Sequence, residues 1–443
     1  VTDIENPPAA TRATDRLPDG GATSGAAGAT RSRAARRRRA AVEWTVLILA
    51  ALLIAFLIKT FLFQAFYIPS ESMVPTLRVG DRVLVNKLSY DLHDVHRGDI
   101  VVFKAPRAAQ SGNIEDLVLD MRVVTPQGIL AHAHPLPRES LGGDVRKWML
   151  GSEGSCGIIT EAIVKIFPAP ESQEYGSILF PDLAHGLAFM YELAQTAHIP
   201  ASVRLVDNLQ LQVNFAIKPK THGWGAMKSA LEKWAVTSIK GFSMDEVVAC
   251  TLVFEGCRAD VKAQQRKVYS LARRHGGMSG GASNGKRGYM LTYGIAYIRD
   301  WLLNHWVIAE SFETSVAWTD AMALIDRVKK RIATEHAARK LPGRPLVTAR
   351  VTQIYATGVC VYFYFAMYYK GVPDPSGVYH EIENAARDEI LKAGGSLSHH
   401  HGVGRLRRHF LPRTMSEAAM RWRVGARMVL DPRGIIGGRA CAS

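Results

Sequence analysis

An apolar segment near the N-terminus constrains this chain more than any other feature. Every residue of Val46–Ile58 is apolar, and the apolar character resumes at Phe61–Phe63 after a short polar interruption. A helix over Trp44–Phe66 would be long enough to span a bilayer, with Lys59 reaching towards the interface. No small-residue cleavage site follows, so a cleaved secretory signal fits less well. We therefore predict one transmembrane helix within residues 41–66, with a buried core helix as the alternative.

Basic residues crowd immediately before this segment. Arg31, Arg33 and Arg36–Arg39 contribute to a net charge of +15. A basic block beside a membrane helix is typical of its cytoplasmic flank, which predicts a cytoplasmic N-terminus and a membrane partner. Residues 1–40 are rich in Ala, Gly, Arg and Thr without apolar periodicity, so we expect a disordered tail. No nucleic-acid-binding motif accompanies the charge, and we predict no nucleic-acid partner.

The rest of the chain changes character near Gly112. Residues 67–104 contain short apolar runs at Asp81–Val85 and Asp99–Phe103, each preceded by glycine, and they predict short strands. After Gly112 the pattern is a long alternation of strand-like and helix-like pieces. Helical spacing of apolar residues predicts helices at 321–332 and 378–390, with Gly394 as a stop signal. Strict alternation over Val359–Phe365 predicts a strand with Tyr362 and Tyr364 on one face.

The cysteines do not show the spacing of a disulfide framework. They are odd in number and have no short repeated spacing, which argues against disulfides and against a zinc site. We expect reduced and mostly buried thiols at all five positions, Cys156, Cys250, Cys257, Cys360 and Cys441.

One motif follows the apolar segment directly. Tyr67–Leu77 reads Tyr-Ile-Pro-Ser-Glu-Ser-Met-Val-Pro-Thr-Leu and, with Gly80–Lys87 and Arg97–Phe103, resembles bacterial type I signal peptidases. The resemblance implies that Ser72 is the nucleophile and that Ser70 helps to form the oxyanion hole. Such a hydroxyl needs a neutral lysine as its base. The family's lysine-bearing strand is absent from the sequence, so we predict that this membrane-anchored serine peptidase, the alternative function, is inactive.

A glycine-rich turn marks the start of the second part. Gly112–Val118 and Val123–Pro126 precede Gly151–Glu161, whose glycines would let backbone N–H groups approach a bound anion or ring closely. Ile158 and Ile159 could lie against a flat aromatic face. An ordinary turn is the alternative reading. Together these segments resemble flavoproteins of the vanillyl-alcohol-oxidase type.

Later motifs narrow the resemblance to the alkylglycerone-phosphate synthases, also called alkyldihydroxyacetonephosphate synthases. The motifs occur in that family's order at Ala201–Asp207, Arg287–Tyr293, Ala296–Asp300, Glu310–Ser315, Cys360–Phe365 and Gly394–Gly404. The resemblance covers about residues 112–443 and implies an FAD-dependent transferase of ether lipid synthesis. Such an enzyme replaces the acyl chain of acyl-dihydroxyacetone phosphate by a long-chain fatty alcohol, with no net redox change. A homodimer and a peroxisomal location are also implied.

The same resemblance assigns the candidate residues. Arg299 and Arg204 match substrate-binding arginines, and a guanidinium binds phosphate bidentately; a surface ion pair with Asp300 is the alternative for Arg299. Tyr362 matches the catalytic tyrosine, although the strand pattern alone favours a core or rim position. The triplet His399, His400 and His401 matches catalytic histidines, and a metal tract or a tag are alternatives. The residues that match the cofactor-binding segment are Glu153, Gly154, Ser155, Cys156, Gly157, Ile158 and Ile159.

These observations predict an α+β protein. It would contain a partial vanillyl-alcohol-oxidase-type FAD domain and an α/β cap domain, preceded by one transmembrane helix and a short all-β fragment. The two resemblances meet near residues 105–111, which suggests a chimeric chain. The expected segments are a basic tail (1–40), the transmembrane helix (41–66), the peptidase-like fragment (67–106), the partial FAD domain (107–168), the cap (169–395) and a C-terminal segment that returns to the flavin site (396–443).

Overall fold

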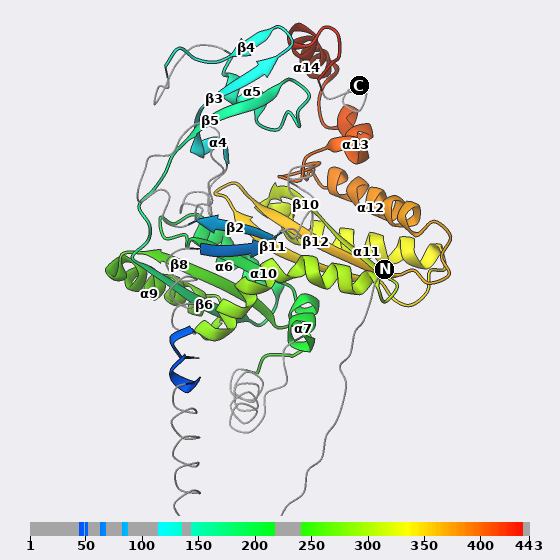
Figure 1. Cartoon of the computed structure of the whole chain (residues 1–443). Coiled ribbons are helices and arrows are strands. Elements are labelled where there is room, and N and C mark those ends of the chain that lie inside the picture. The colour runs from blue at the N-terminus through cyan, green and yellow to red at the C-terminus, as the bar shows by residue number, and fades with distance from the viewer. Residues whose placement is uncertain are drawn as a thin grey trace, which may run out of the picture. The chain divides into compact units, whose positions relative to one another are not determined.

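The computed structural model describes residues 44–47, 49–51, 63–67, 82–86, 114–134, 143–217 and 241–436. The chain divides into two compact units, Val1–Val102 and Phe103–Ser443. The second unit contains two sheets, one of three strands and one of seven (Figure 1).

The first unit contains a short antiparallel ribbon. Strand β1 (Phe63–Tyr67) pairs with β2 (Arg82–Asn86), with Phe63 opposite Asn86 and Tyr67 opposite Arg82. The prediction that a helix continues to about Phe66 is therefore wrong, because these aromatic-rich residues favour an extended strand whose backbone pairs with β2.

Residues 44–47 and 49–51 are helical, while 52–62 lie outside the described residues. Within the described ranges, none of the helices combines the length and apolar character that a bilayer crossing requires. The serine motif and the strand expected at Asp99–Phe103 also lie outside the described residues.

The large sheet of the second unit is antiparallel throughout, in the order β10-β12-β11-β7-β8-β6-β9. Its strands are β6 (Ser172–Phe180), β7 (Ser202–Val206), β8 (Val248–Gly256), β9 (Met278–Ser279), β10 (Val307–Ala317), β11 (Leu346–Ile354) and β12 (Gly358–Tyr368). The predicted strand at 359–365 is confirmed as the centre of β12. It alternates as expected, with Val361, Phe363 and Phe365 buried.

Four helices pack against the face that carries these buried side chains. They are α6 (Leu183–Ala194), α9 (Arg258–Arg274), α11 (Ala321–Ala338) and α12 (Pro375–Lys392), and their apolar residues form one core cluster with the sheet. The helices predicted at 321–332 and 378–390 are confirmed as parts of α11 and α12. The chain leaves α12 through Gly394, whose φ of +76° favours glycine.

Helices α7 (Asn208–Ala216) and α10 (Ala282–Leu303) also lie against the large sheet. Close approach of α10 depends on glycine, because a Cβ at Gly285 would collide with the backbone of Gly176 in β6. The cavity described below lies beside these two helices, and its lining includes Arg204, Arg350 and Tyr364 from the strands.

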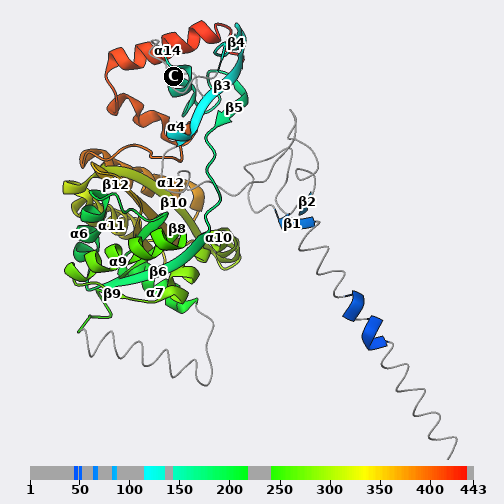
Figure 2. The ribbon, with the colours of Figure 1, turned by 90° about the vertical axis from the view of Figure 1, so that its left-hand side faces the viewer.

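The small sheet has the order β4-β3-β5, formed by β3 (Val118–Thr125), β4 (Gly128–Leu130) and β5 (Ile158–Val164). It follows α4 (Ile114–Leu117) and packs on α5 (Val145–Met149). Figure 2 shows α14 (Glu417–Leu430) near these strands, and Trp422 on α14 meets Trp148 on α5 edge to face, with ring centroids 4.5 Å apart. The segments η4 (Trp318–Asp320), α13 (Gly404–Arg407) and η5 (Arg408–Arg413) complete the described elements of this unit.

Candidate active site

Three polar side chains from neighbouring strands share one face of the large sheet. Glu313 on β10 lies opposite Tyr362 on β12, and Tyr362 lies opposite Arg350 on β11. Residues directly opposite one another project to the same side of a sheet. The guanidinium of Arg350 lies 5.0 Å from the ring centre of Tyr362 and 4.8 Å from that of Tyr364. Strand register therefore assembles a carboxylate, a phenol and a cation from three separate parts of the sequence.

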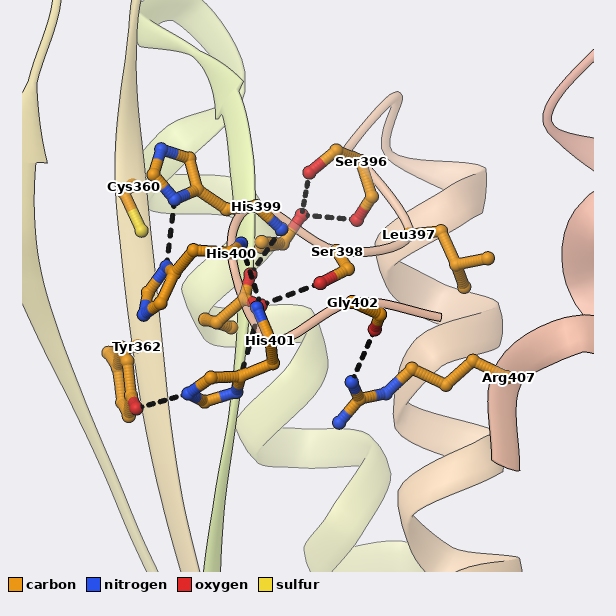
Figure 3. Close-up of polar contacts among 12 residues, drawn as sticks. Cys360, Tyr362, Ser396, Leu397, Ser398, His399, His400, His401, Gly402 and Arg407 are labelled. Atoms are coloured by element: carbon orange, nitrogen blue, oxygen red, sulfur yellow. Dashed lines mark hydrogen bonds and ion pairs between the residues drawn. The ribbon is translucent and has the colours of Figure 1, made fainter. Parts of the chain in front are cut away.

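Glu313 anchors the histidine triplet. Its Oε1 accepts hydrogen bonds from the backbone N–H of His401 at 2.8 Å and of His400 at 3.2 Å, and its Oε2 accepts one from His399 at 2.5 Å. The hydroxyl of Ser398 donates to Oε1 at 2.8 Å (Figure 3). Burial would raise the pKa of Glu313, but the backbone N–H groups of His401 and His399 and the Ser398 hydroxyl lower it to about 2. The buried carboxylate is therefore ionised and holds the loop by charge-assisted hydrogen bonds.

Further contacts fasten the loop before and after the triplet. Ser396 Oγ accepts a hydrogen bond from the backbone N–H of Ser315 at 2.8 Å. Buried Arg387 on α12 donates from Nη1 to the carbonyl of Leu397 at 2.7 Å, and Arg407 donates to the carbonyl of Gly402 at 2.7 Å. The backbone of the triplet is thus held at both ends, which leaves its imidazoles to project towards the sheet.

Tyr362 and His401 form a hydrogen-bonded pair. Tyr362 OH and His401 Nε2 are 2.6 Å apart, and His401 Nδ1 lies 3.7 Å from Glu313 Oε1 (Figure 3). Burial raises the pKa of Tyr362, and burial lowers the pKa of His401, although Glu313 opposes that second shift. At neutral pH the pair therefore consists of a protonated phenol and a neutral imidazole, the states needed to pass a proton between them.

His399 and His400 face a different way. Their Nδ1 atoms lie 2.8 Å apart, and His399 Nε2 lies 2.6 Å from Tyr355 OH. Burial lowers the pKa of His399, with a further contribution from His400. Burial raises the pKa of Tyr355 to about 12, and that of Cys360 also to about 12. His401 thus hydrogen-bonds to Tyr362, while His399 and His400 lie beside Tyr355 and Cys360, and the His400 ring is also 5.8 Å from that of Tyr362.

The predicted cofactor segment contacts the same loop. Glu153 has a positive φ of 52°, and its carboxylate accepts hydrogen bonds from the backbone N–H groups of Val403 and, at 2.8 Å, of Gly404. A Cβ at Gly402 would collide with that carboxylate. The structure therefore brings the turn at 151–157 against the residues that follow the histidine triplet.

The remaining cofactor candidates divide between a cavity and an exposed strand. Ser155 and Cys156 line a cavity of about 1190 Å³ between α5 and α14. Ile158 and Ile159 on β5 are 58% and 47% exposed, and as successive strand residues they point to opposite faces, so a flat ring system would lie against one of them. Gly157 packs against Val123 and leaves no room for a side chain.

A second cavity, of about 210 Å³, lies on the Tyr362 side of the large sheet. Arg204, Arg287 and Arg350 line it, together with Tyr364. Within the described part of the chain, Arg287 Nε and Nη1 and Arg350 Nε are buried without a hydrogen-bond partner. Burial lowers the pKa of Arg287. The remaining lining is largely apolar and includes Leu211, Phe215, Leu291, Leu302, Leu346 and Ala366.

The two arginines assigned from the sequence occupy different environments. Arg204 lines this cavity and lies 5.4 Å from the ring centre of Tyr289. Arg299 is on the exposed part of α10, where it pairs with Asp300 and Glu310 at 3.3 Å each. It is not among the residues that line the cavity, and its substrate-binding role stays a prediction.

Comparison with known proteins places this site in a family. Residues 169–439 match the family model for FAD linked oxidases, C-terminal domain. The chain belongs to this family. An alkyldihydroxyacetonephosphate synthase of Caenorhabditis elegans is 43% identical over 325 residues, which cover 73% of this chain and 54% of that protein. A solved alkyldihydroxyacetonephosphate synthase superposes with a TM-score of 0.59 at 27% identity and covers 76% of this chain and 56% of the other. The resemblance predicted from the motifs is confirmed, and the chain spans about half the length of these relatives.

The N-terminal resemblance is confirmed as well. Residues 41–123 match the signal peptidase family, peptidase S26. A probable signal peptidase I of Synechocystis sp. is 33% identical over 133 residues, which cover 30% of this chain and 52% of that protein. Ser70 and Ser72 lie outside the described residues, so the structure does not place the peptidase-like nucleophile.

Several residues of this site were not among the candidates predicted from the sequence: Glu313, Arg287, Arg350, Tyr355 and Cys360. A partial signal existed for two of them. Glu313 and Arg350 are charged residues in the middle of strand segments, a position that is costly unless the charge is paired or functional. Their functional meaning depends on their partners. Strand register places Glu313 and Arg350 opposite Tyr362, and the histidine triplet that Glu313 binds lies much later in the sequence.

Proposed function

We propose that the C-terminal part of this chain binds FAD and acts as an alkylglycerone-phosphate synthase. The reaction would replace the acyl chain of acyl-dihydroxyacetone phosphate by a long-chain fatty alcohol. The carbon–oxygen bond to the fatty acid breaks, the acid leaves, and the alcohol oxygen forms the new ether bond with no net redox change. The observation that carries the proposal is the largely apolar cavity whose lining includes Arg204, Arg287, Arg350 and Tyr364.

The arginines supply the phosphate chemistry of this substrate. Arg287 and Arg350 have buried nitrogen atoms without partners among the described residues, and burying an unpaired cationic donor costs free energy. A phosphate would satisfy these donors through charge-assisted hydrogen bonds, which guanidinium groups make bidentately. Arg204 lines the same cavity, and the family resemblance makes it a substrate-binding residue. These features favour an anionic headgroup with an apolar chain over a neutral polar substrate.

Tyr362 and His401 supply acid–base chemistry next to that cavity. Arg350 connects the two places, because it lines the cavity and lies over the ring of Tyr362. The buried phenol keeps its proton at neutral pH and donates it at Tyr362 OH, where an oxygen of the departing acid would take it. His401 Nε2, 2.6 Å away, accepts the proton that the arriving alcohol releases. Glu313 holds the His401 backbone in place and does not titrate near neutral pH.

The residues present fit the ring end of FAD. Ile158 and Ile159 each expose an apolar side chain on one face of β5, and the Glu153 carboxylate accepts a hydrogen bond from the histidine loop at Gly404. When bound, FAD supplies the reactive isoalloxazine ring on which the exchange of the two chains depends. The sequence before Gly112 has the signal-peptidase resemblance in place of the family's pyrophosphate-binding half, so cofactor affinity is the first property to measure.

The test uses the full chain. We expect the purified protein to acquire a protein-bound yellow flavin band after addition of FAD and gel filtration. With acyl-dihydroxyacetone phosphate and a labelled long-chain alcohol, it should form the labelled ether and release fatty acid. Tyr362→Phe is the matched variant, which should retain the flavin band and lose the transfer. A folded protein that stays colourless with excess FAD would overturn the proposal.

For the N-terminal part we propose a single-pass membrane anchor with a cytoplasmic N-terminus. The support is the apolar sequence 46–58 behind Arg36–Arg39 and the match of residues 41–123 to signal peptidases. The full chain should stay with membranes after an alkaline wash, and a variant without residues 41–66 should be released. Recovery of the full chain in the wash would contradict the anchor. We expect no preprotein cleavage by the full chain or by its Ser72→Ala variant, because the family's base lysine is missing from the sequence.

A further inference from the structure

Three metal-binding side chains converge beside the Tyr362–His401 pair. The thiol of Cys360 and ring nitrogens of His399 and His400 all lie within 4.8 Å of one another. Figure 3 shows the sulfur of Cys360 beside the two facing imidazoles, while His401 points away to Tyr362. Cys360 is buried in β12, His399 is half-buried, and His400 is exposed. We propose that these three residues form a binding site for a thiophilic divalent metal ion, with Zn²⁺ as the natural candidate.

The hydrogen bonds around His399 prepare it as a ligand. Tyr355 OH donates to Gln353 Oε1 at 3.1 Å, so it accepts from His399 Nε2, 2.6 Å away. That assignment places the proton of His399 on Nε2 and leaves the lone pair of Nδ1 directed at His400. A hydrogen bond to the second ring nitrogen is the usual device that orients a metal-bound histidine. His399 is therefore a ligand whose orientation is already held by Tyr355, and Tyr355 is held in turn by Gln353.

The other two ligands complete a soft donor set. Thr352 Oγ1 donates to Cys360 Sγ at 3.4 Å and would stabilise the thiolate that forms when an ion displaces the thiol proton into solvent. His400 Nδ1 lies 2.8 Å from His399 Nδ1, and the exposed His400 ring is free to adjust. Thiolate and imidazole together suit Zn²⁺, with bonds of about 2.3 Å to sulfur and about 2.0 Å to nitrogen. Solvent at His400 would supply the fourth ligand.

A metal ion bound at this site would affect the transfer reaction, an effect that rests on the proposed function. The ion would engage two of the three histidines that the family resemblance makes catalytic, while His401 and Tyr362 stay free. Zinc would then affect the transfer reaction only through His399 and His400, and would leave the proton transfer at Tyr362 and His401 in place. The binding claim itself does not depend on activity or on FAD, and its test uses neither.

The test is a titration of the full chain, purified without a polyhistidine tag and kept reduced, with Co²⁺ as a spectroscopic substitute for Zn²⁺. A thiolate-to-cobalt charge-transfer band should appear in the near ultraviolet and disappear when Zn²⁺ is added. Cys360→Ser should abolish this band, and His400→Ala should weaken Co²⁺ binding at least about tenfold. Cys257→Ser, which removes an exposed thiol at the start of α9, is the matched control and should leave the band intact.

The outcomes decide the proposal independently of folding defects. Circular dichroism establishes that each variant is folded. If Cys360→Ser fails to fold, His400→Ala still tests the site, because it changes only an exposed side chain. A folded wild-type chain that shows no charge-transfer band at excess Co²⁺ would overturn the site. So would a band that survives in folded Cys360→Ser, or unchanged affinity in His400→Ala. A positive band in a chain without transferase activity would support the site and count only against the proposed function.

Discussion

The carboxylate of Glu313 lies beneath the backbone of His401, whose N–H donates to Oε1 at 2.8 Å, while Oε1 and Nδ1 of the same histidine are 3.7 Å apart. One buried side chain on β10 therefore determines where the loop 399–401 sits. Because Glu313 is opposite Tyr362 in the sheet, it also determines which imidazole reaches the phenol.

Glu313→Gln should destabilise the protein and loosen the triplet. The folded-state pKa of about 2 lies below the ordinary 4.5, so ionised Glu313 contributes stability above pH 4.5 that is lost as the pH falls towards 2. The contribution is on the order of 3 kcal/mol at neutral pH. Urea unfolding at several pH values would measure it. Glu310→Gln, which removes only an exposed partner of Arg299, should change the free energy of unfolding by less than about 1 kcal/mol. Equal losses in the two variants would contradict the anchoring role.

Tyr362→Phe should lower the transfer rate about 10²–10⁴-fold with little change in KM, because it removes a proton donor and keeps the ring under Arg350. The measurement is steady-state turnover with the labelled alcohol. Tyr191→Phe is the control, since Tyr191 is half exposed and Phe keeps the ring that meets Trp318 edge to face. A Tyr362→Phe enzyme at full rate would remove the phenol from the mechanism.

The pH profile should reflect a neutral His401. Burial places its folded-state pKa below the ordinary 6.5, so the imidazole is protonated only at lower pH and the rate should fall on that acidic side. The midpoint of the acidic limb should therefore lie below 6.5. Glu313→Gln removes the opposing charge and should move the midpoint further down. A limb centred above 6.5 would contradict this assignment.

Arg287→Leu should raise KM for the phosphate substrate about tenfold to a hundredfold, since a charge-assisted hydrogen bond is worth about 1.5–3 kcal/mol. Arg287→Lys should recover part of the loss, because it restores the charge without the bidentate geometry. Arg327→Leu, on the exposed side of α11, is the control and should leave KM unchanged. Equal KM values in all three variants would place phosphate recognition elsewhere.

Gly402→Ala should separate the Glu153 turn from the histidine loop. Gly402 has a φ of +80°, and a Cβ there would collide with the Glu153 carboxylate. The strain should cost about 1–3 kcal/mol of unfolding free energy. Gly425→Ala is the matched control, because Gly425 lies in α14 with open space around it and alanine favours a helix by about 1 kcal/mol. The melting temperature should therefore fall in Gly402→Ala and rise in Gly425→Ala. A rise in both variants would contradict the close contact between Gly402 and Glu153.

The sequence by itself determined the family, the alternation of β12 and the helices α11 and α12. Motif order and apolar periodicity are local properties that the chain carries whatever its tertiary structure. The same local reasoning was wrong at Phe63–Phe66, where a run of aromatic residues suits a strand as well as a helix and pairing with β2 decided the outcome.

Only the tertiary structure decided how the site is composed. It divided the histidine triplet, with His401 at Tyr362 and with His399 and His400 beside Cys360. It placed Arg350 over Tyr362 on the next strand, and Glu313 beneath the triplet, 88 residues before His401 in the sequence. Strand register and a loop held by a buried carboxylate create these contacts. Both depend on pairing between distant segments, which a single sequence does not reveal.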